Sequence, residues 1–192
     1  MNLEMLRDEY DLARRYTQSL YADLPEAAVH WRPASKSSAI GWHLGHQAAV
    51  NHFLVRNLLA AEPSLNPQFD ALFDAITPEE QRGTLPPLPD ILAYREAIAR
   101  RTHAHLEAVL AGTRPAAQQA TYALGPLLLS LINHEYQHDC WVREMRALLG
   151  RETPDVVWSR AVCQMDGYWV LPAAPSRPPP GLRHHGACWR YA

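Results

Sequence analysis

The chain has few cysteines, no long apolar segment and no concentration of basic residues, and each lack excludes a class of protein. Three cysteines in 192 residues are odd in number and too few for a disulfide scaffold, which predicts a protein of the reducing cytoplasm. No apolar run approaches the roughly 18 residues that a membrane span needs, and the charged N-terminal segment does not resemble a signal peptide. The net charge is −2 with no block of Lys and Arg, so we expect neither nucleic acid nor a membrane as partner.

Helical periodicity dominates the first 150 residues. Apolar residues recur at intervals of three or four with polar residues between them, a pattern typical of helices that bury one face. Ser37 or Ser38 offers an N-cap for the second helix, Gly125-Pro126 marks the expected start of the last helix, and Gly150 its end. Four helices of about 20 residues predict an all-α four-helix bundle. The predicted helices cover about residues 2–22, 38–61, 88–111 and 125–150.

The composition changes after Gly150. The segment VVWSRAVCQMDGYWVL is compatible with a short strand, and five prolines follow it within nine residues, from Pro172 to Pro180. Such a proline-rich segment favours a loop or disorder over a packed helix. We therefore expect a bundle over residues 1–150 and a C-terminal extension over residues 151–192, with a short strand before an irregular end.

Two histidines four positions apart mark the last predicted helix. The segment HEYQH places His134 and His138 one helical turn apart on the same face. That face is otherwise apolar, so both imidazoles point toward the bundle interior, where an unsatisfied polar nitrogen costs about 1–3 kcal/mol. A shared metal ion satisfies both rings at once. The alternative is a pair of core histidines that are hydrogen-bonded to other groups.

The same pentapeptide fits H-E-x-x-H, the signature of zinc peptidases. Those enzymes need a third ligand downstream, but Trp141 and Glu144 stand where the extended signature needs Gly and His. The later Glu152 lies too close to the helix end to fold back onto the pair. A zincin-type peptidase is therefore disfavoured. Glu135, the glutamate of the signature, is a candidate general base, and a salt bridge or a surface carboxylate is the simpler interpretation.

The third ligand is sought upstream, in the second predicted helix. Its sequence IGWHLGHQAAVNHF contains His43, His46 and His52, all of them candidates. This helix is apolar on nearly every side, so its hydrophobic pattern does not say which face meets the last helix. Helical geometry alone leaves His43 and His46 open.

A resemblance decides between them. The motif W-x-L-x-H, formed by Trp42, Leu44 and His46, followed by H-x-x-x-H at His134 and His138, resembles the DinB-like family, also called DinB/YfiT-like metalloenzymes. The resemblance covers the whole predicted bundle. It implies a four-helix bundle with a three-histidine metal site, in which His46, His134 and His138 are the ligands.

Three neutral imidazoles leave the charge of a divalent zinc, nickel or iron ion uncompensated and leave coordination positions open. Some members of the family are S-transferases that use bacillithiol or mycothiol. The resemblance therefore implies an enzyme that activates a low-molecular-weight thiol for S-transfer to a small electrophile, its small-molecule substrate. A metal-hydroxide hydrolase and a non-enzymatic metal-binding bundle stay open as alternatives. The sequence identifies no catalytic or thiol-binding residue, and it is compatible with a homodimer.

Overall fold

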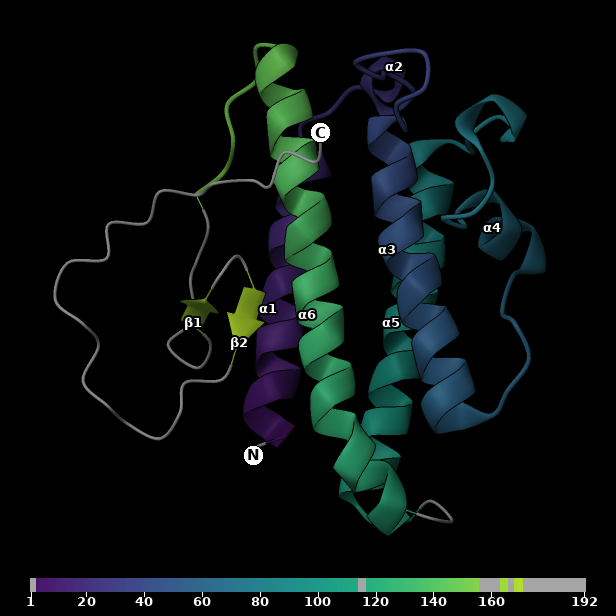
Figure 1. Cartoon of the computed structure of the whole chain (residues 1–192), viewed down its shortest axis with the longest axis vertical. Helices are drawn as coiled ribbons and strands as arrows, with labels where there is room; N and C mark the ends of the chain where they lie inside the picture. The colour runs from purple at the N-terminus through teal and green to yellow at the C-terminus, as the bar shows by residue number, and fades with distance from the viewer. Residues whose placement is uncertain (1–2, 114–116, 156–162, 166–167, 171–192) are drawn as a thin grey trace, which may run out of the picture.

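Four long helices lie side by side and make up most of the computed structural model (Figure 1). Helix α1 packs on α6, α3 packs on α5 and α6, and α5 also contacts α6. The predicted all-α four-helix bundle is thereby confirmed. The structure describes residues 3–113, 117–155, 163–165 and 168–170. The long helices are α1 (Leu3–Tyr21), α3 (Ile40–Val55), α5 (Leu88–Leu110) and α6 (Ala117–Leu148).

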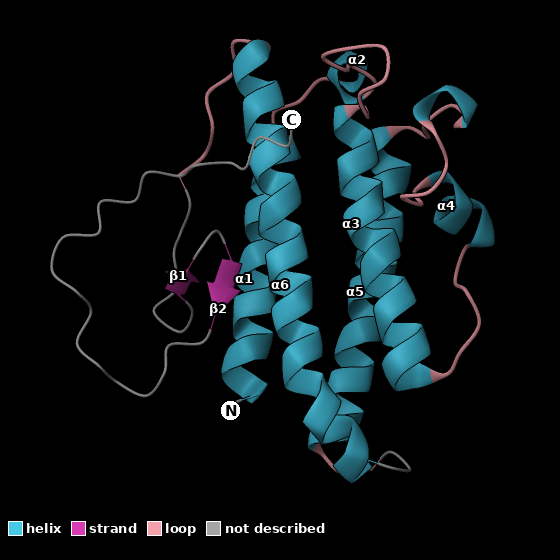
Figure 2. Cartoon of the chain, viewed as in Figure 1, coloured by secondary structure: helices cyan, strands magenta, loops and turns pink. Residues whose placement is uncertain are grey.

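Short elements fill the connections between the long helices. A π-helical turn, η1, continues α3, and a single 3-10 turn, η2, precedes α5. In the C-terminal extension two strands pair antiparallel, with Cys163 opposite Val170, and β2 contacts α6 beside the bundle (Figure 2). The short strand expected there is thus one half of a hairpin, whereas the proline-rich end lies outside the described residues. The short elements are α2 (Glu26–Val29), η1 (Arg56–Ala60), α4 (Pro67–Leu72), η2 (Glu79–Gln81), β1 (Cys163–Met165) and β2 (Tyr168–Val170).

Helix α3 is deeply packed in the bundle and buries 13 of its 16 residues. Two glycines let neighbouring segments approach it closely. A Cβ atom at Gly41 would lie 2.3 Å from Cγ1 of Val29 in α2, and one at Gly45 would lie 2.2 Å from the Phe73 ring that follows α4. Although α3 is strongly apolar, no helix in the described ranges has the length and hydrophobicity needed to cross a bilayer.

The predicted serine cap of the second helix is wrong. Helix α3 begins at Ile40 after Ala39, which makes no side-chain capping bond. The hydroxyl of Ser38 instead accepts a hydrogen bond from Arg82 at 3.0 Å. Ser38 therefore bonds to a residue distant in the sequence and not to the N-terminus of α3, where the sequence pattern predicted it to act as a cap. The predicted extent, to about Ala61, holds only with the π-helical turn η1 included, and Ala61 itself adopts a left-handed conformation with φ of 50°.

The last helix begins earlier than predicted. Helix α6 starts at Ala117, so Pro126 lies inside the helix rather than at its start. An interior proline costs about 3 kcal/mol because it removes an N–H and crowds the preceding turn. The freed carbonyl is that of Tyr122, a residue that is 79% exposed, so water can replace the missing donor. Burial of Leu124 and Leu128 on the adjoining turns outweighs the local cost.

The predicted end of that helix is confirmed. Gly150 has a φ of +66°, which glycine adopts without steric penalty. Its N–H donates to the Ala147 carbonyl at 3.0 Å, and the Arg151 N–H donates to the Arg146 carbonyl at 3.0 Å. These bonds satisfy carbonyls that the helix end would otherwise leave free.

Candidate metal centre

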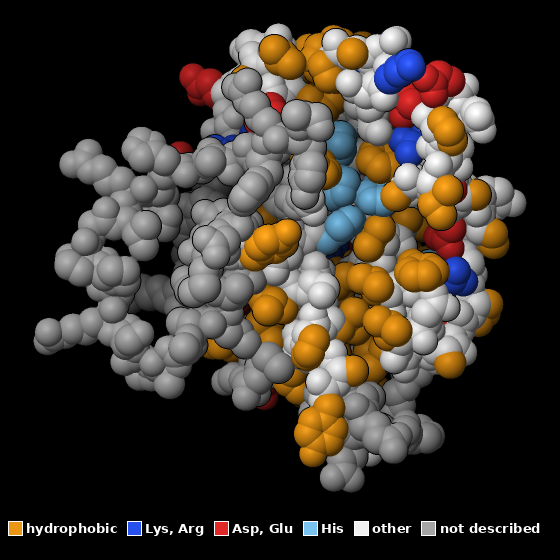
Figure 3. Space-filling model, viewed as in Figure 1, with side chains coloured by type: hydrophobic (Ala, Val, Ile, Leu, Met, Phe, Trp, Pro, Cys, Tyr) orange, Lys and Arg blue, Asp and Glu red, His pale blue; other side chains and the backbone are white. Residues whose placement is uncertain are grey.

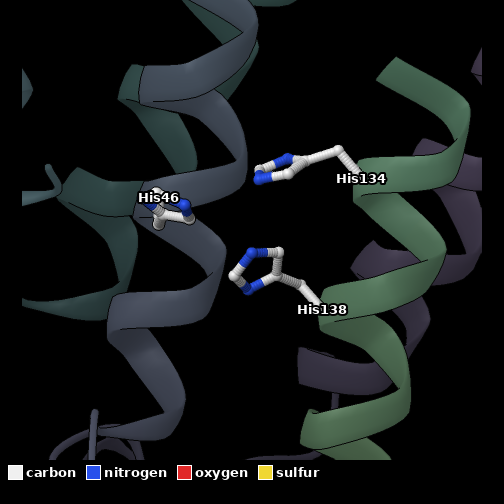
Figure 4. A group of neighbouring side chains, drawn as sticks. All are labelled: His46, His134 and His138. Carbon is white, nitrogen blue, oxygen red and sulfur yellow. The ribbon is translucent and has the colours of Figure 1, made fainter. Parts of the chain in front are cut away.

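Three histidines converge in the space between helices α3 and α6 (Figure 4). His46 comes from α3, and His134 and His138 come from successive turns of α6. One ring nitrogen of each lies within 4.8 Å of the corresponding nitrogens of the other two. The structure therefore brings together the three residues that the sequence nominated, and that they hold a metal stays a prediction.

The other two histidines of α3 take different positions. His52 lies near the far end of α3, where its Nε2 accepts a hydrogen bond from the Leu65 N–H at 2.9 Å. His43 also faces α6, but its Nδ1 lies 2.9 Å from Nδ1 of His138. Its own nitrogens are not among the three that cluster. His43 is therefore a neighbour of the candidate ligands, and His52 is a structural hydrogen-bond acceptor.

Burial lowers the pKa of each of the three imidazoles, because it disfavours the charged ring. The pKa of His134 falls to about 4, that of His46 is lowered, and that of His138 lies well below its usual value. At neutral pH each ring is uncharged and carries one nitrogen lone pair, the form in which imidazole binds a metal. The donor set thus fits a divalent transition metal.

His46 is held by contacts on two sides. Its Nδ1 donates to the Phe73 carbonyl at 2.7 Å, because a carbonyl can only accept. Nε2 therefore carries the lone pair that is available to a metal. The ring stacks on Trp42 with centroids 4.4 Å apart and an interplanar angle of 15°. Tautomer and ring plane are both set by the protein.

The Phe73 carbonyl is positioned by the loop that follows α4. The Phe73 ring packs where Gly45 has no side chain. Arg82 donates to the next carbonyl, that of Asp74, at 3.1 Å. The guanidinium carbon of Arg82 also lies 4.1 Å from the centre of the Trp42 ring. Arg82, Trp42 and His46 therefore form a layered stack that attaches this loop to α3.

Adding one methyl group at Gly45 should disturb this attachment. We expect Gly45→Ala to lower the free energy of unfolding by about 1–3 kcal/mol, because the new Cβ overlaps the Phe73 ring and one of them must shift. Urea denaturation measures the change. Gly83→Ala is the matched control, since a Cβ there meets Leu72 at an ordinary 3.6 Å, and it should change stability by less than about 0.5 kcal/mol. Equal stability of the two variants would show that the loop does not depend on the close approach at Gly45.

A comparison with protein-family models supports the resemblance to the DinB-like family. The model of the DinB superfamily matches residues 9–142, which include most of α1, all of α3 and α5, and the three clustered histidines. The chain belongs to the DinB superfamily. A search of the curated proteins found none that matches it.

In this DinB-superfamily chain, Glu135 faces the bundle interior rather than the histidines' open side. Its Oε2 accepts from Arg95 at 2.5 Å and from the Thr17 hydroxyl at 2.7 Å. The side chains of Arg95 and Glu135 are 5% and 3% exposed. Of the three possible roles of Glu135, the structure shows the salt bridge and not a surface carboxylate. A buried paired carboxylate is poorly suited to act as a general base on a bound ligand.

A polar network that the sequence did not suggest extends this salt bridge across the bundle. One oxygen of Asp139 lies 3.0 Å from the Thr17 hydroxyl oxygen, and the other accepts a hydrogen bond from Gln47 at 3.2 Å. Gln47 also donates to the Glu135 carbonyl at 3.0 Å. Burial raises the pKa of Asp139 well above its usual value. In the sequence, an acidic residue directly follows each histidine of the α6 pair, and this repetition was the signal that could have identified the network.

The network fixes the orientation of the helix that carries two candidate ligands. Glu135 and Asp139 each follow a histidine by one residue, so they point about 100° away from it around the helix axis. Their partners come from α1, α3 and α5. Rotation of α6 about its own axis would break these contacts. The α6 histidines therefore face α3 from a helix whose rotation is fixed by contacts with α1, α3 and α5.

The histidine cluster is open to solvent on one face. Figure 3 shows histidine side chains at the surface on one face of the molecule, with apolar side chains near them. His46 and His138 are 5% and 4% exposed, whereas His134 is only partly buried. Trp42 is buried beside the cluster, and its indole N–H has no acceptor among the described residues. A ligand that reaches the cluster from this face would meet neutral donors and aromatic rings.

Proposed function

We propose that this protein holds one divalent transition metal through His46, His134 and His138 and uses it to transfer a low-molecular-weight thiol to a small electrophile. The single observation that carries the metal assignment is the convergence of three neutral imidazole nitrogens from two helices within 4.8 Å. Three protein ligands with a solvent-facing side are typical of catalytic sites, because the remaining positions stay available to a substrate. Zinc, nickel and iron all suit imidazole ligands.

The charges around the cluster support an anionic ligand. Two carboxylates directly follow the α6 histidines in sequence, and both are engaged elsewhere: Glu135 pairs with Arg95, and Asp139 accepts a hydrogen bond from Gln47. Glu79 lies 2.8 Å from Arg82 and 2.6 Å from Arg32. None of these three carboxylates is free to balance the charge of a bound cation. A divalent metal on three neutral rings therefore keeps its full charge for a ligand of opposite sign, such as a thiolate.

The thiol is proposed because the metal, when bound, stabilises a thiolate at neutral pH. The protein's own part is to exclude water and to orient the sulfur. Trp42 and Trp141 provide apolar walls, since Trp42 stacks on His46 and Trp141 lies edge-on to His138 with centroids 4.8 Å apart. The S–H bond breaks and sulfur forms a bond to carbon of the electrophile. In a substitution the bond from that carbon to the leaving group breaks and the leaving group takes the proton, whereas in an addition a π bond of the electrophile breaks and the product keeps the proton. No oxidant or reductant is needed.

A cobalt-substituted protein tests this proposal. We expect bacillithiol, mycothiol or glutathione to produce a sulfur-to-metal charge-transfer band near stoichiometric thiol, because a soft thiolate binds the open position. The absorption titration should be repeated on His138→Ala, which should show no band at the same concentrations. Consumption of the same thiol with a panel of small electrophiles measures the transfer itself.

The same experiment separates the proposal from its two alternatives. A protein whose cobalt spectrum no thiol perturbs, and which consumes none with any electrophile, is not a thiol transferase. Metal-dependent hydrolysis of small esters would then favour the hydrolase. Tight metal binding with no turnover of either kind would favour a non-enzymatic metal-binding bundle.

A further inference from the structure

We infer that His43 is a positioning residue for the metal, acting through His138 as the acceptor that fixes the tautomer of that ligand. This inference rests on the proposed metal site. Nδ1 of His43 and Nδ1 of His138 are 2.9 Å apart. Two bare nitrogens at that distance would repel, so one of them carries a proton and donates it to the other.

The direction of this hydrogen bond follows from the geometry of His138. With Nδ1 engaged by His43, only Nε2 of His138 is left for the cluster, and Figure 4 shows one ring nitrogen directed toward His46 and His134 and the other directed away. A nitrogen that binds a metal carries no proton. In the loaded protein the proton of His138 is therefore on Nδ1, which donates to His43, and His43 carries its own proton on Nε2.

The position of His43 is itself fixed. The side chain is 8% exposed. It packs edge-on against Trp42 with ring centroids 5.4 Å apart, and at a tilt of 46° against Trp141 with centroids 5.8 Å apart. Trp141 also contacts the His138 ring. The acceptor is thus held in place before a metal arrives, and His138 needs no rearrangement to present Nε2.

The arrangement parallels that of His46, whose Nδ1 donates to the Phe73 carbonyl. Ligating histidines commonly donate their second ring N–H to a carboxylate or a carbonyl, which orients the ring and raises the basicity of the ligand. At His138 an imidazole takes that place. A backbone carbonyl cannot be removed by substitution but an imidazole can, so the contribution of His43 can be measured.

Two substitutions at His43 distinguish the effect of its ring packing on zinc affinity from the effect of its hydrogen-bond acceptor. His43→Phe keeps a flat ring in the aromatic packing and removes the acceptor, and we expect zinc affinity to fall by about 10- to 100-fold. His43→Asn places a carbonyl oxygen near the position of Nδ1 and should bind zinc more tightly than His43→Phe does. Competition with a chromophoric chelator measures both. His52→Phe is the matched control, because it also removes a buried acceptor from α3, but one that serves the Leu65 N–H.

The ring nitrogens provide a readout that does not depend on any variant. Nitrogen NMR of zinc-loaded wild type should show the proton of His138 on Nδ1 and that of His43 on Nε2. A proton on Nδ1 of His43 would overturn the inference, as would zinc affinity in His43→Phe equal to wild type. If His43→Phe does not fold, the ring tautomers and His43→Asn decide. Wild type that binds no zinc would refute the proposed metal site, and the role of His43 with it.

Discussion

Replacing His138 by alanine should release the metal from the purified protein. The variant loses one of the three proposed ligands, and we expect its zinc affinity to fall by more than about 100-fold, because loss of an outer partner alone costs about 10- to 100-fold. The two carboxylates that follow the α6 histidines cannot replace the lost ligand, since Glu135 is paired with Arg95 and Asp139 is hydrogen-bonded to Gln47. Elemental analysis of protein purified without a histidine tag, combined with chelator competition, measures the loss.

Thermal unfolding gives a second measurement of the same effect. A metal that links α3 to α6 binds only the folded chain, so zinc should raise the melting temperature of wild type and leave that of His138→Ala nearly unchanged. His52→Ala is the control, because it removes a buried histidine of α3 outside the cluster and should keep its metal. Unchanged metal content in His138→Ala would rule out the proposed site.

Substitutions on α3 test which histidine completes the site. His46→Ala should lose as much affinity as His138→Ala, whereas His43→Ala should lose less, since it removes an outer partner and not a ligand. The reverse order, with His46→Ala binding like wild type and His43→Ala binding nothing, would assign the third ligand to His43. The order of the two affinities therefore separates the two residues that helical geometry left open.

The sequence predicted that His134 and His138 act as a pair, because residues four positions apart lie on the same face of a helix. It did not predict the third ligand from pattern alone, and the structure explains why. Helix α3 is buried against α5, α6 and the loop after α4, so no polar face distinguishes one side from another. His43 and His46 both contact His138. Only the family motif separated them before the structure was known.

Errors at the helix starts have a common cause. The local sequence pattern predicts Ser38 as the N-cap of α3 and Pro126 as a first residue of α6. Packing and bonding with other residues decide where both helices actually begin. Ser38 accepts a hydrogen bond from Arg82, 44 positions away. Pro126 is tolerated inside α6 because Leu124 and Leu128 are buried on either side of it. Gly150 was predicted correctly because its role depends on its own backbone conformation and not on distant residues.

The polar network was missed for the same reason, and it predicts the second large effect. Thr17 and Glu135 are 118 positions apart, and Arg95 and Glu135 are 40 apart. No periodicity in the sequence links them. Within the bundle, however, a buried ion pair makes each partner depend on the other, because either charge alone would be left without compensation in a poorly solvated interior.

Removal of Arg95 should therefore be among the most destabilising substitutions in the chain. We expect Arg95→Met to lower the free energy of unfolding by about 3–5 kcal/mol, because the Glu135 carboxylate would stay buried without its cation. Urea denaturation followed by circular dichroism measures the difference. Arg100→Met is the matched control on the same helix, since the ion pair of Arg100 with Glu96 has side chains that are 69% and 56% exposed, and it should cost less than about 1 kcal/mol.

A double substitution distinguishes an unpaired charge from lost packing. Arg95→Met combined with Glu135→Leu removes both charges, so the combined variant should be more stable than Arg95→Met alone. If the double variant is instead destabilised by the sum of the two single effects, the loss comes from packing and the ion pair contributes nothing.

The zinc content of a Glu135 variant tests whether this residue anchors α6 or binds the metal. Glu135→Gln keeps the shape of the side chain, and the variant should retain its zinc if Glu135 only anchors α6. If Glu135 bound the metal directly, the Glu135→Gln variant would lose zinc.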